Sequence, residues 1–208
     1  MILNYKQLKI NIFLIALFIS FSCFSQEKLI TGLIIEGGKG NTSQVENGKI
    51  LQEVTDLGSR RNIDYILNAA LGYKLRFKSN EKSFYDIDFL AGIKKINSDI
   101  ENTGKTDSIF LGYSGRYIFL DFSVSAAYQY KVWKNLYAGI GLSPTYYFFE
   151  SSERKWRFDL PVTVKVGYDF KYVDLALIYK RGMLHALKSE VFAKGNINDI
   201  QLQLFIPF

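Results

Sequence analysis

Apolar and polar residues alternate along most of the chain with the period of two that a β-strand imposes on its two faces. The clearest stretch is 156–168, where an apolar residue occupies every second position and charged, polar or small residues stand between them. The last nine residues, 200–208, show the same pattern and end on Phe208, while Asp199, Gln201 and Gln203 point to the opposite face. A spacing of two over this length predicts strands with one apolar face rather than amphipathic helices.

Eight segments show this alternation, and together they account for most of the sequence beyond residue 28. We expect strands at 29–37, 63–77, 84–96, 117–130, 136–149, 156–168, 172–180 and 200–208. Most of them reach about ten residues, the length that a tilted strand needs to cross the hydrocarbon of a membrane. The first is the least regular because of Ile30 and Ile34, but Glu36 indicates that Leu33 and Ile35 point outward.

The connections between these segments alternate in length. Those after the second, fourth and sixth segments are short and fall at 78–82, 131–135 and 169–171. Those after the first, third and seventh are long and fall at 38–62, 97–116 and 181–196. Short periplasmic turns opposite long extracellular loops are typical of outer-membrane β-barrels.

Alternation by itself does not say which face is inside, because a soluble lipocalin-like barrel alternates equally well with its apolar face inward. Strand length, uneven connections and aromatics near the strand ends favour a membrane barrel with its apolar face outward. We predict a periplasmic ring of Tyr73, Phe77, Tyr128, Tyr130, Trp133, Tyr137, Tyr168 and Tyr172. We predict an outer ring of Tyr65, Tyr117, Tyr146, Phe148, Trp156 and Tyr179.

With the apolar face outward, many charged residues face the interior. The expected inward anions are Glu36, Asp64, Asp86, Asp88, Asp121, Asp159, Asp169 and Asp174, and the cations are Lys74, Arg76, Lys94, Arg157, Lys165 and Lys180. An eight-stranded barrel is only wide enough for side chains to fill it. An isolated buried charge is costly, so we expect these groups to form an interior network of ion pairs rather than an ion path.

The N-terminal residues predict secretion. Residues 1–25 contain Lys6 and Lys9, no acid, an apolar run at 10–19, and Ser25 at a suitable cleavage position. We expect 1–25 to be a signal peptide and 26–208 to be one barrel domain; an uncleaved anchor and a lipoprotein modified at Cys23 are the alternatives. Cleavage removes the only cysteine and leaves 24 basic residues against 20 acidic ones, a net charge of +4 that is too small to indicate nucleic-acid binding.

The mature chain resembles the small eight-stranded outer-membrane β-barrel family that includes the OmpA- and OmpX-type proteins. Alternating apolar residues that lead to a terminal aromatic carry the most specific part of the resemblance, at Ile200, Leu202, Leu204, Ile206 and Phe208. The resemblance implies an all-β, antiparallel, up-and-down transmembrane barrel with a filled interior, monomeric in the outer membrane. It also implies contact with outer-membrane lipids and lipopolysaccharide, and recognition of the last strand by the barrel-insertion machinery.

Candidate chemistry is sparse. His185 and Ser189 lie in an expected outer loop, where some barrels of this kind carry a lipid A-modifying Ser and His, but no acidic residue is placed to complete a triad. Asp99, Glu101 and Asp107 lack the spacing of an EF-hand. Three glycines, Gly37, Gly38 and Gly40, lead into a polar stretch that we interpret as the start of a mobile loop. We expect no catalytic residue, cofactor or metal.

Two classes of function follow. In the first, the barrel has a structural or surface-binding role through its outer loops, with Lys180, Arg181, Lys188 and Lys194 as candidate contacts for anionic headgroups. In the second, it is a narrow pore or an accessory barrel for transport or secretion. A general porin is not expected, since a water-filled channel takes about sixteen strands.

The terminal strand gives a first testable prediction. Deleting Phe208 removes the aromatic on which the expected assembly signal depends, so the truncated chain should accumulate unfolded in the periplasm. Cell fractionation and the heat-dependent gel shift of a folded barrel would measure this. Normal levels of the truncated protein in the outer membrane would contradict the prediction.

Overall fold

The structure, a computed structural model, describes residues 28–47, 59–102, 115–149, 156–186 and 192–208. The expected signal peptide at 1–25 lies outside these residues. The strands are β1 (Lys28–Asn47), β2 (Ser59–Lys78), β3 (Ser83–Asn102), β4 (Gly115–Trp133), β5 (Leu136–Leu142), β6 (Thr145–Phe149), β7 (Trp156–Asp159), β8 (Val162–Asp169), β9 (Asp174–Arg181) and β10 (Phe192–Pro207). Within these ranges no helix is long and apolar enough to cross a membrane.

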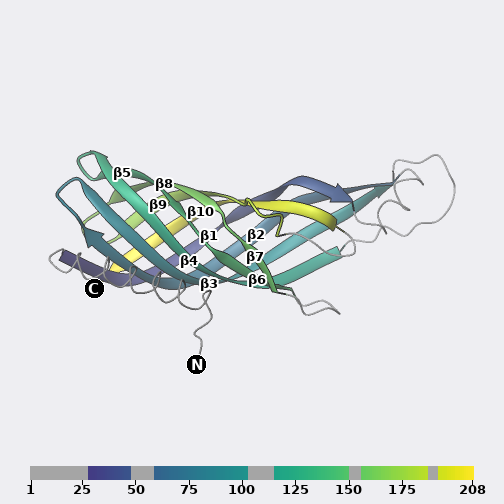
Figure 1. The fold of residues 1–208 in the computed structure, drawn as a ribbon, viewed down its shortest axis with the longest axis horizontal. Helices are drawn as coiled ribbons and strands as arrows, with labels where there is room; N and C mark the ends of the chain where they lie inside the picture. Colours follow the sequence, from purple (N-terminus) through teal and green to yellow (C-terminus); the bar gives the residue numbers. More distant parts are fainter. Residues whose placement is uncertain (1–27, 48–58, 103–114, 150–155, 187–191) are drawn as a thin grey trace, which may run out of the picture.

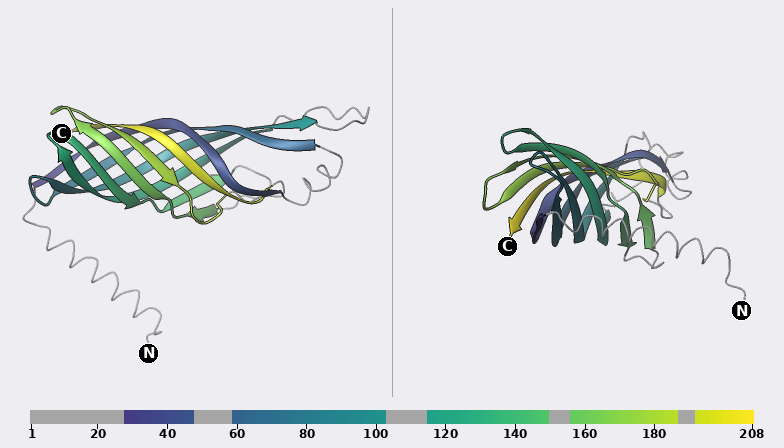
Figure 2. Two further views of the ribbon diagram at one scale, coloured as in Figure 1. Left: turned by 90° about the horizontal axis from the view of Figure 1, so that it is seen from above. Right: turned by 60° about the vertical axis from the view of Figure 1, so that its left-hand side comes forward.

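The strands form a closed antiparallel barrel. Neighbours in the sequence pair around the ring, and β1 pairs with β10 in a long ladder that runs from Gly32 opposite Pro207 to Asn47 opposite Phe192. The strands wrap around a common axis with a steep tilt, and the C-terminus lies at the same end as the β4–β5 turn (Figures 1 and 2). Closure satisfies the backbone of β1 and β10, which would otherwise be the two sheet edges.

The ten strands make up the eight that the sequence predicts, because two of them are interrupted. Pro144 separates β5 from β6, and Pro161 separates β7 from β8. Both parts of each pair keep one register with their neighbours, so each pair is a single strand with a gap in its ladder. Proline has no N–H to donate, and the two breaks lie side by side, with the Ser143 amide donating to the Pro161 carbonyl at 2.9 Å.

The strands extend further than predicted at the end opposite the short turns. Strand extends into each of the expected loops at 38–62, 97–116 and 181–196, and it covers 38–47, 59–62, 97–102, 115–116, 181 and 192–196. The glycines Gly37, Gly38 and Gly40, interpreted as a loop start, pair with both β2 and β10. Ladder hydrogen bonds need only the backbone, so the strands continue where both faces have become polar and the alternation has ended (Figure 1).

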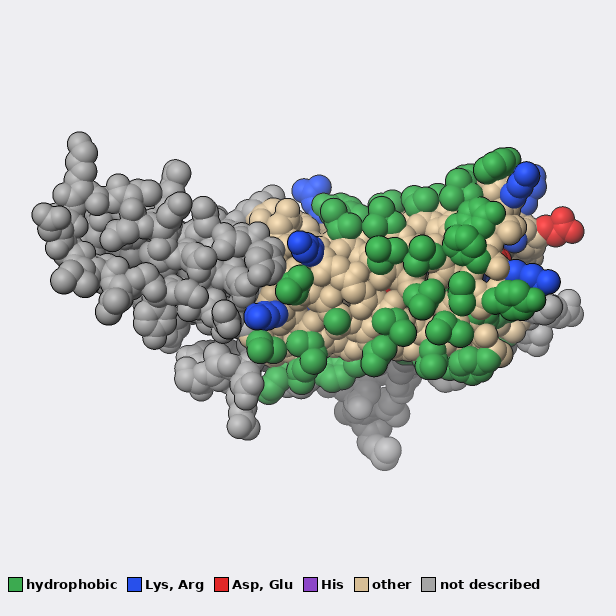
Figure 3. Space-filling model, turned by 180° about the vertical axis from the view of Figure 1, so that it is seen from behind, with side chains coloured by type: hydrophobic (Ala, Val, Ile, Leu, Met, Phe, Trp, Pro, Cys, Tyr) green, Lys and Arg blue, Asp and Glu red, His purple; other side chains and the backbone are tan. Residues whose placement is uncertain are grey.

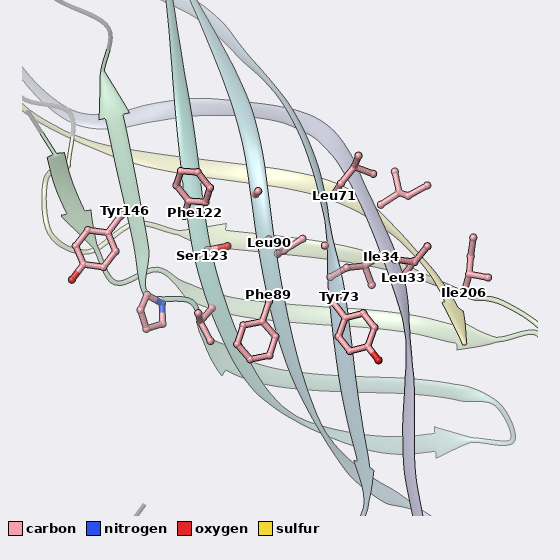
Figure 4. A pocket seen from close by; sticks show the side chains of 15 residues that line it. Leu33, Ile34, Leu71, Tyr73, Phe89, Leu90, Phe122, Ser123, Tyr146 and Ile206 are labelled. Atoms are coloured by element: carbon pink, nitrogen blue, oxygen red, sulfur yellow. The ribbon is translucent and has the colours of Figure 1, made fainter. Parts of the chain in front are cut away.

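The apolar face points outward, as predicted. Leu71 is 64% exposed and Val164 is 45% exposed, and apolar side chains form a broad band around the barrel with basic side chains at its two ends (Figure 3). On one side of this band a shallow hollow of about 810 Å³ lies over β1 to β4 (Figure 4). Its lining includes Ala91, a small outward residue that leaves space between the larger side chains that point away from the barrel.

The aromatic rings are partly as predicted. Of the predicted rings, the members exposed at the turn end are Tyr73, Tyr128, Tyr130, Trp133, Tyr168 and Tyr172, and Tyr146 and Tyr179 are exposed nearer the other end. The side chains of Tyr65, Tyr117 and Trp156 lie outside the described part. The prediction for Tyr137 is wrong: it is 1% exposed and packs edge-on against Phe84 inside the barrel, with 5.2 Å between ring centroids. Tyr137 shares the inward face with Gly139 and Gly141, and its closeness to a turn does not change that face.

The two neighbours Val164 and Lys165 test the orientation of the wall. Val164→Arg places a charge against hydrocarbon and should destabilise the barrel by roughly 2–4 kcal/mol, whereas Val164→Leu should be close to neutral. Lys165→Met puts no charge into lipid, so its cost should come from the interior network instead. Urea unfolding in lipid vesicles measures all three. A neutral Val164→Arg would show that this face meets water.

Candidate functional site

The interior of the barrel is charged. The predicted inward residues that are buried are Glu36, Lys74, Arg76, Asp86, Asp88, Lys94, Asp121, Asp159, Lys165, Asp174 and Lys180. Arg157 and Asp169 are half-buried, and the side chain of Asp64 lies outside the described part. The prediction of an interior network is therefore confirmed for most of its members.

The strongest interaction joins three strands through Arg76. Its Nε and Nη2 atoms donate to the two carboxylate oxygens of Asp86 at 2.7 and 3.0 Å, and its Nη1 atom donates to Asp174 at 2.5 Å. A two-pronged arginine–carboxylate contact is both strong and directional. Because Arg76, Asp86 and Asp174 come from β2, β3 and β9, this group links distant parts of the wall across the interior.

A second group is centred on the amide of Gln203. Its Oε1 atom accepts from Lys74 at 2.7 Å and from Lys165 at 2.9 Å. Its Nε2 atom donates to Glu36 at 2.5 Å and to Asp88 at 3.0 Å. One uncharged side chain thus satisfies two cations and two anions at once.

The charges of these two groups balance. Asp88 also pairs with Lys165 at 3.2 Å, and Lys180 donates to Glu36 at 2.8 Å. The four cations are Lys74, Arg76, Lys165 and Lys180, and the four anions are Glu36, Asp86, Asp88 and Asp174. A neutral, hydrogen-bonded network is the form in which buried charges are tolerated.

A separate cluster lies farther from the short turns. Lys94 forms an ion pair with Asp199, and the Asn68 amide donates to the same carboxylate at 2.9 Å. Asp121 is buried nearby, and the Lys94 ammonium lies 5.9 Å from the ring centre of Tyr147. Asp199 and Gln203 were absent from the predicted set of partners, although the alternation of 200–208 had already placed both on the inward face.

Aromatic side chains fill the interior at the turn end. The Arg76 guanidinium lies 4.2 Å from the centre of the Phe84 ring and 5.1 Å from that of Phe205, and Tyr137 packs against Phe84. Phe119 and Tyr147 make a similar edge-on contact at 5.7 Å nearer the other end. The described interior is therefore occupied by side chains at both levels.

Asp159 stabilises a part of the wall where the backbone ladder is incomplete. Among the described residues β7 pairs only with β6, so its other edge has no ladder partner. The Asp159 Oδ1 atom instead accepts from the backbone amides of Leu160, Met183 and Leu184 at 2.8, 3.0 and 2.9 Å. The carboxylate stands in for the missing backbone pairing between β7 and the segment that follows β9.

The other candidates from the sequence do not form a reactive site in the described residues. The His185 backbone amide donates to Asn196 at 3.0 Å, and Ser189 lies outside the described range. Within that range no three His, Cys, Asp or Glu side chains are grouped to hold a metal, and the side chains of Asp99, Glu101 and Asp107 lie beyond it.

The predicted headgroup contacts need one correction. Lys180 is not a surface residue, because it points inward and pairs with Glu36. Residues at odd positions along this part of β9 face outward, so the neighbouring Arg181 is exposed. The side chains of Lys188 and Lys194 lie outside the described part.

A closed antiparallel ring of eight strands, an apolar outer band bounded by aromatics and a paired charged interior define the class of this protein. It is a small outer-membrane β-barrel that crosses the membrane with its strands.

Comparison with known proteins finds solved structures that resemble this chain in fold. No family model matches the chain, and no curated protein matches it. The attachment invasion locus protein Ail of Yersinia pestis, solved with the heparin analogue sucrose octasulfate, is 14% identical over 86% of this chain and 99% of its own, with a TM-score of 0.45. Neisserial surface protein A is 12% identical over 86% and 97%, with a TM-score of 0.45. OprG of Pseudomonas aeruginosa is 12% identical over 86% and 91%, with a TM-score of 0.43.

The Arg76–Asp86 pair tests how the interior is held together. Asp86→Ala leaves Arg76 and Lys74 short of a buried partner and should cost about 3–5 kcal/mol of unfolding free energy. Asp86→Asn keeps an acceptor oxygen and the size of the side chain, so it should cost less than Asp86→Ala. Glu81→Ala, at an exposed turn, is the matched control. Urea unfolding in vesicles measures the free energy of unfolding of each variant. Equal stability of the Asp86→Ala and Glu81→Ala variants would refute the role of the Arg76–Asp86 pair.

Proposed function

We propose that this protein is a structural or surface-binding barrel of the outer membrane, which acts at its ends rather than through its lumen. The observation that carries this proposal is the balanced interior network around Arg76 and Gln203. Moving a solute past these residues would require breaking several buried ion pairs, each costly to separate.

The same interior argues against the transport alternative. Eight strands leave room for side chains and not for a water channel. Long side chains from opposite walls meet at the axis, as Lys165 of β8 does with Asp88 of β3 at 3.2 Å. A planar bilayer recording should show no steady conductance, and a reproducible conductance step would favour a narrow pore instead.

We propose no catalytic role. In the described residues the interior acids contact lysine, arginine, amide and backbone donors rather than a nucleophile. His185, the one histidine of the sequence, uses its backbone amide to bind Asn196. A lipid A-modifying reaction needs a nucleophile and a base within hydrogen-bond reach.

Lipopolysaccharide is the partner that the outer end fits. Lys39, Lys95 and Arg181 follow the outward-facing positions of β1, β3 and β9 just beyond the apolar band. Leu67 lies between the two lysines in register with both, which puts their strands roughly 10 Å apart. Basic side chains at this depth are placed to contact phosphates of the outer leaflet. Membrane lipid can cover the apolar outer face of the barrel without a second copy of the chain, so we expect the protein to act as a monomer.

The last strand fits recognition by the barrel-insertion machinery, and we propose this partner as well. Ile200, Leu202 and Ile206 of β10 are exposed in one outward row, and Phe208 beyond them lies with its ring 6.1 Å from that of Tyr73. The backbone edge of β10 stays open until it pairs with β1, and this outward apolar row lies along that edge.

Removing the outer basic residues tests the lipopolysaccharide proposal. The triple variant Lys39→Gln, Lys95→Gln and Arg181→Gln should bind lipopolysaccharide about a hundredfold more weakly, at roughly 1 kcal/mol for each residue. Titration of the purified barrel in mild detergent measures this affinity. The charge-retaining variant Lys39→Arg with Lys95→Arg is the control, and equal affinities of the triple variant and this control would refute the proposal.

A further inference from the structure

The short turns carry an unusual number of lysines. Lys82, Lys134 and Lys171 are exposed in the three turns that join β2 to β3, β4 to β5 and β8 to β9, and Lys78 and Lys131 are half-buried beside them. Glu81 and Asp169 are the acidic residues of the same region, and Asp169 accepts a hydrogen bond from the Lys171 amide at 2.9 Å. This end of the barrel, the turn rim, therefore carries a net positive charge.

Two of these lysines hold a backbone conformation that lysine rarely adopts. Lys134 has a φ of 45° and Lys171 has a φ of 75°. Glycine or asparagine takes up this left-handed region with less strain, and asparagine follows directly at Asn135. A charged residue kept at a strained position in both turns indicates a role for the charge itself.

In the turn between β2 and β3, the residue that stabilises the turn is not the residue that carries the charge. Here Asn80 builds the turn, because its Oδ1 atom accepts from the amides of Lys82 and Ser83 at 2.8 and 2.7 Å. The Lys82 side chain is exposed. Beside it, a hollow of about 410 Å³ is lined by Lys78, Lys131, Glu81, Asn80 and Phe84, so the basic rim continues into the mouth of the barrel.

Aromatic neighbours indicate the depth in the membrane at which the side chains of Lys134 and Lys171 lie. The Lys134 ammonium lies 5.0 Å from the ring centre of Trp133, and that of Lys171 lies 5.3 Å from the ring centre of Tyr172. The two rings are 64% and 74% exposed at the edge of the apolar band. Exposed Trp and Tyr side chains reside at the level of lipid headgroups, so the paired ammonium groups lie at the level of the phosphates.

From this juxtaposition we propose that the turn rim binds the headgroups of anionic glycerophospholipids in the periplasmic leaflet. Short turns face the periplasm in this class of barrel, so the turn rim lies at the leaflet opposite the long extracellular loops. Each site consists of one ammonium group held beside an aromatic ring, with a phosphate as its counter-ion. The rim thereby selects anionic over zwitterionic lipid around the barrel.

Trp133 is a built-in reporter for this selection. In a Trp156→Phe background it is the one remaining tryptophan of the sequence, so its quenching by brominated lipid compares phosphatidylglycerol with phosphatidylcholine at this site. We expect phosphatidylglycerol to be favoured about fivefold, the effect of one basic residue near a membrane surface. Lys134→Asn should reduce the ratio to about one, and Lys134→Arg should retain it.

Controls separate charge from folding. Arg181→Gln, at the other end of the barrel, should leave the ratio unchanged. Lys134→Asn suits the positive φ, so in phosphatidylcholine vesicles this variant should unfold at the same or a higher urea concentration than the parent. In phosphatidylglycerol vesicles the parent should gain stability over the double variant Lys134→Asn with Lys171→Asn.

Two results would overturn the proposal. One is a lipid preference that Lys134→Asn leaves intact, since the selection would then not depend on the lysine. The other is a Trp133 response to inorganic phosphate in phosphatidylcholine vesicles that Lys134→Asn abolishes, since the rim would then bind free anions rather than lipid.

Discussion

Backbone hydrogen bonding is the constraint from which the rest of this structure follows. Hydrocarbon offers no partner to an unpaired N–H or C=O group, so a sheet that crosses a membrane must close on itself. Here β1 meets β10 in a ladder that reaches from Gly32 to Asn47. Closure with eight strands then sets the bore, and the bore sets what the inward side chains have to do.

The inward side chains satisfy one another instead of enclosing space. Long residues from one wall reach short or charged residues of the opposite wall, and Gln203 joins four of them with a single amide. The pairs of Asp86 with Arg76 and Lys74 lie across one hairpin, whereas the contacts of Gln203 and Asp174 link residues far apart in the chain. The barrel interior therefore ties the strands together a second time, independently of the backbone ladder.

The sequence predicts the direction of each side chain better than the extent or partners of each strand. Period-two alternation placed Glu36, Lys165 and Asp199 inward, because a strand has only two faces. Alternation appears only where one face of a strand is apolar and the other polar, however. It ends where β1 and β10 extend beyond the apolar band, so the sequence pattern did not predict the outer parts of these two strands. The pairing of Lys94 with Asp199 was also out of reach, since it depends on the stagger of the closed barrel and not on spacing along the chain.

Because of Asp159, some positions in the barrel wall tolerate substitution much less well than others. Most of the barrel is closed by main-chain bonds that survive almost any substitution, so outward positions can drift among apolar residues. Between β7 and the segment after β9, the main-chain amides of Met183 and Leu184 depend on one carboxylate, which also accepts from the adjacent Leu160 amide. At that seam the closure of the barrel depends on Asp159, so one substitution at this position removes the bonds that join β7 to the segment after β9.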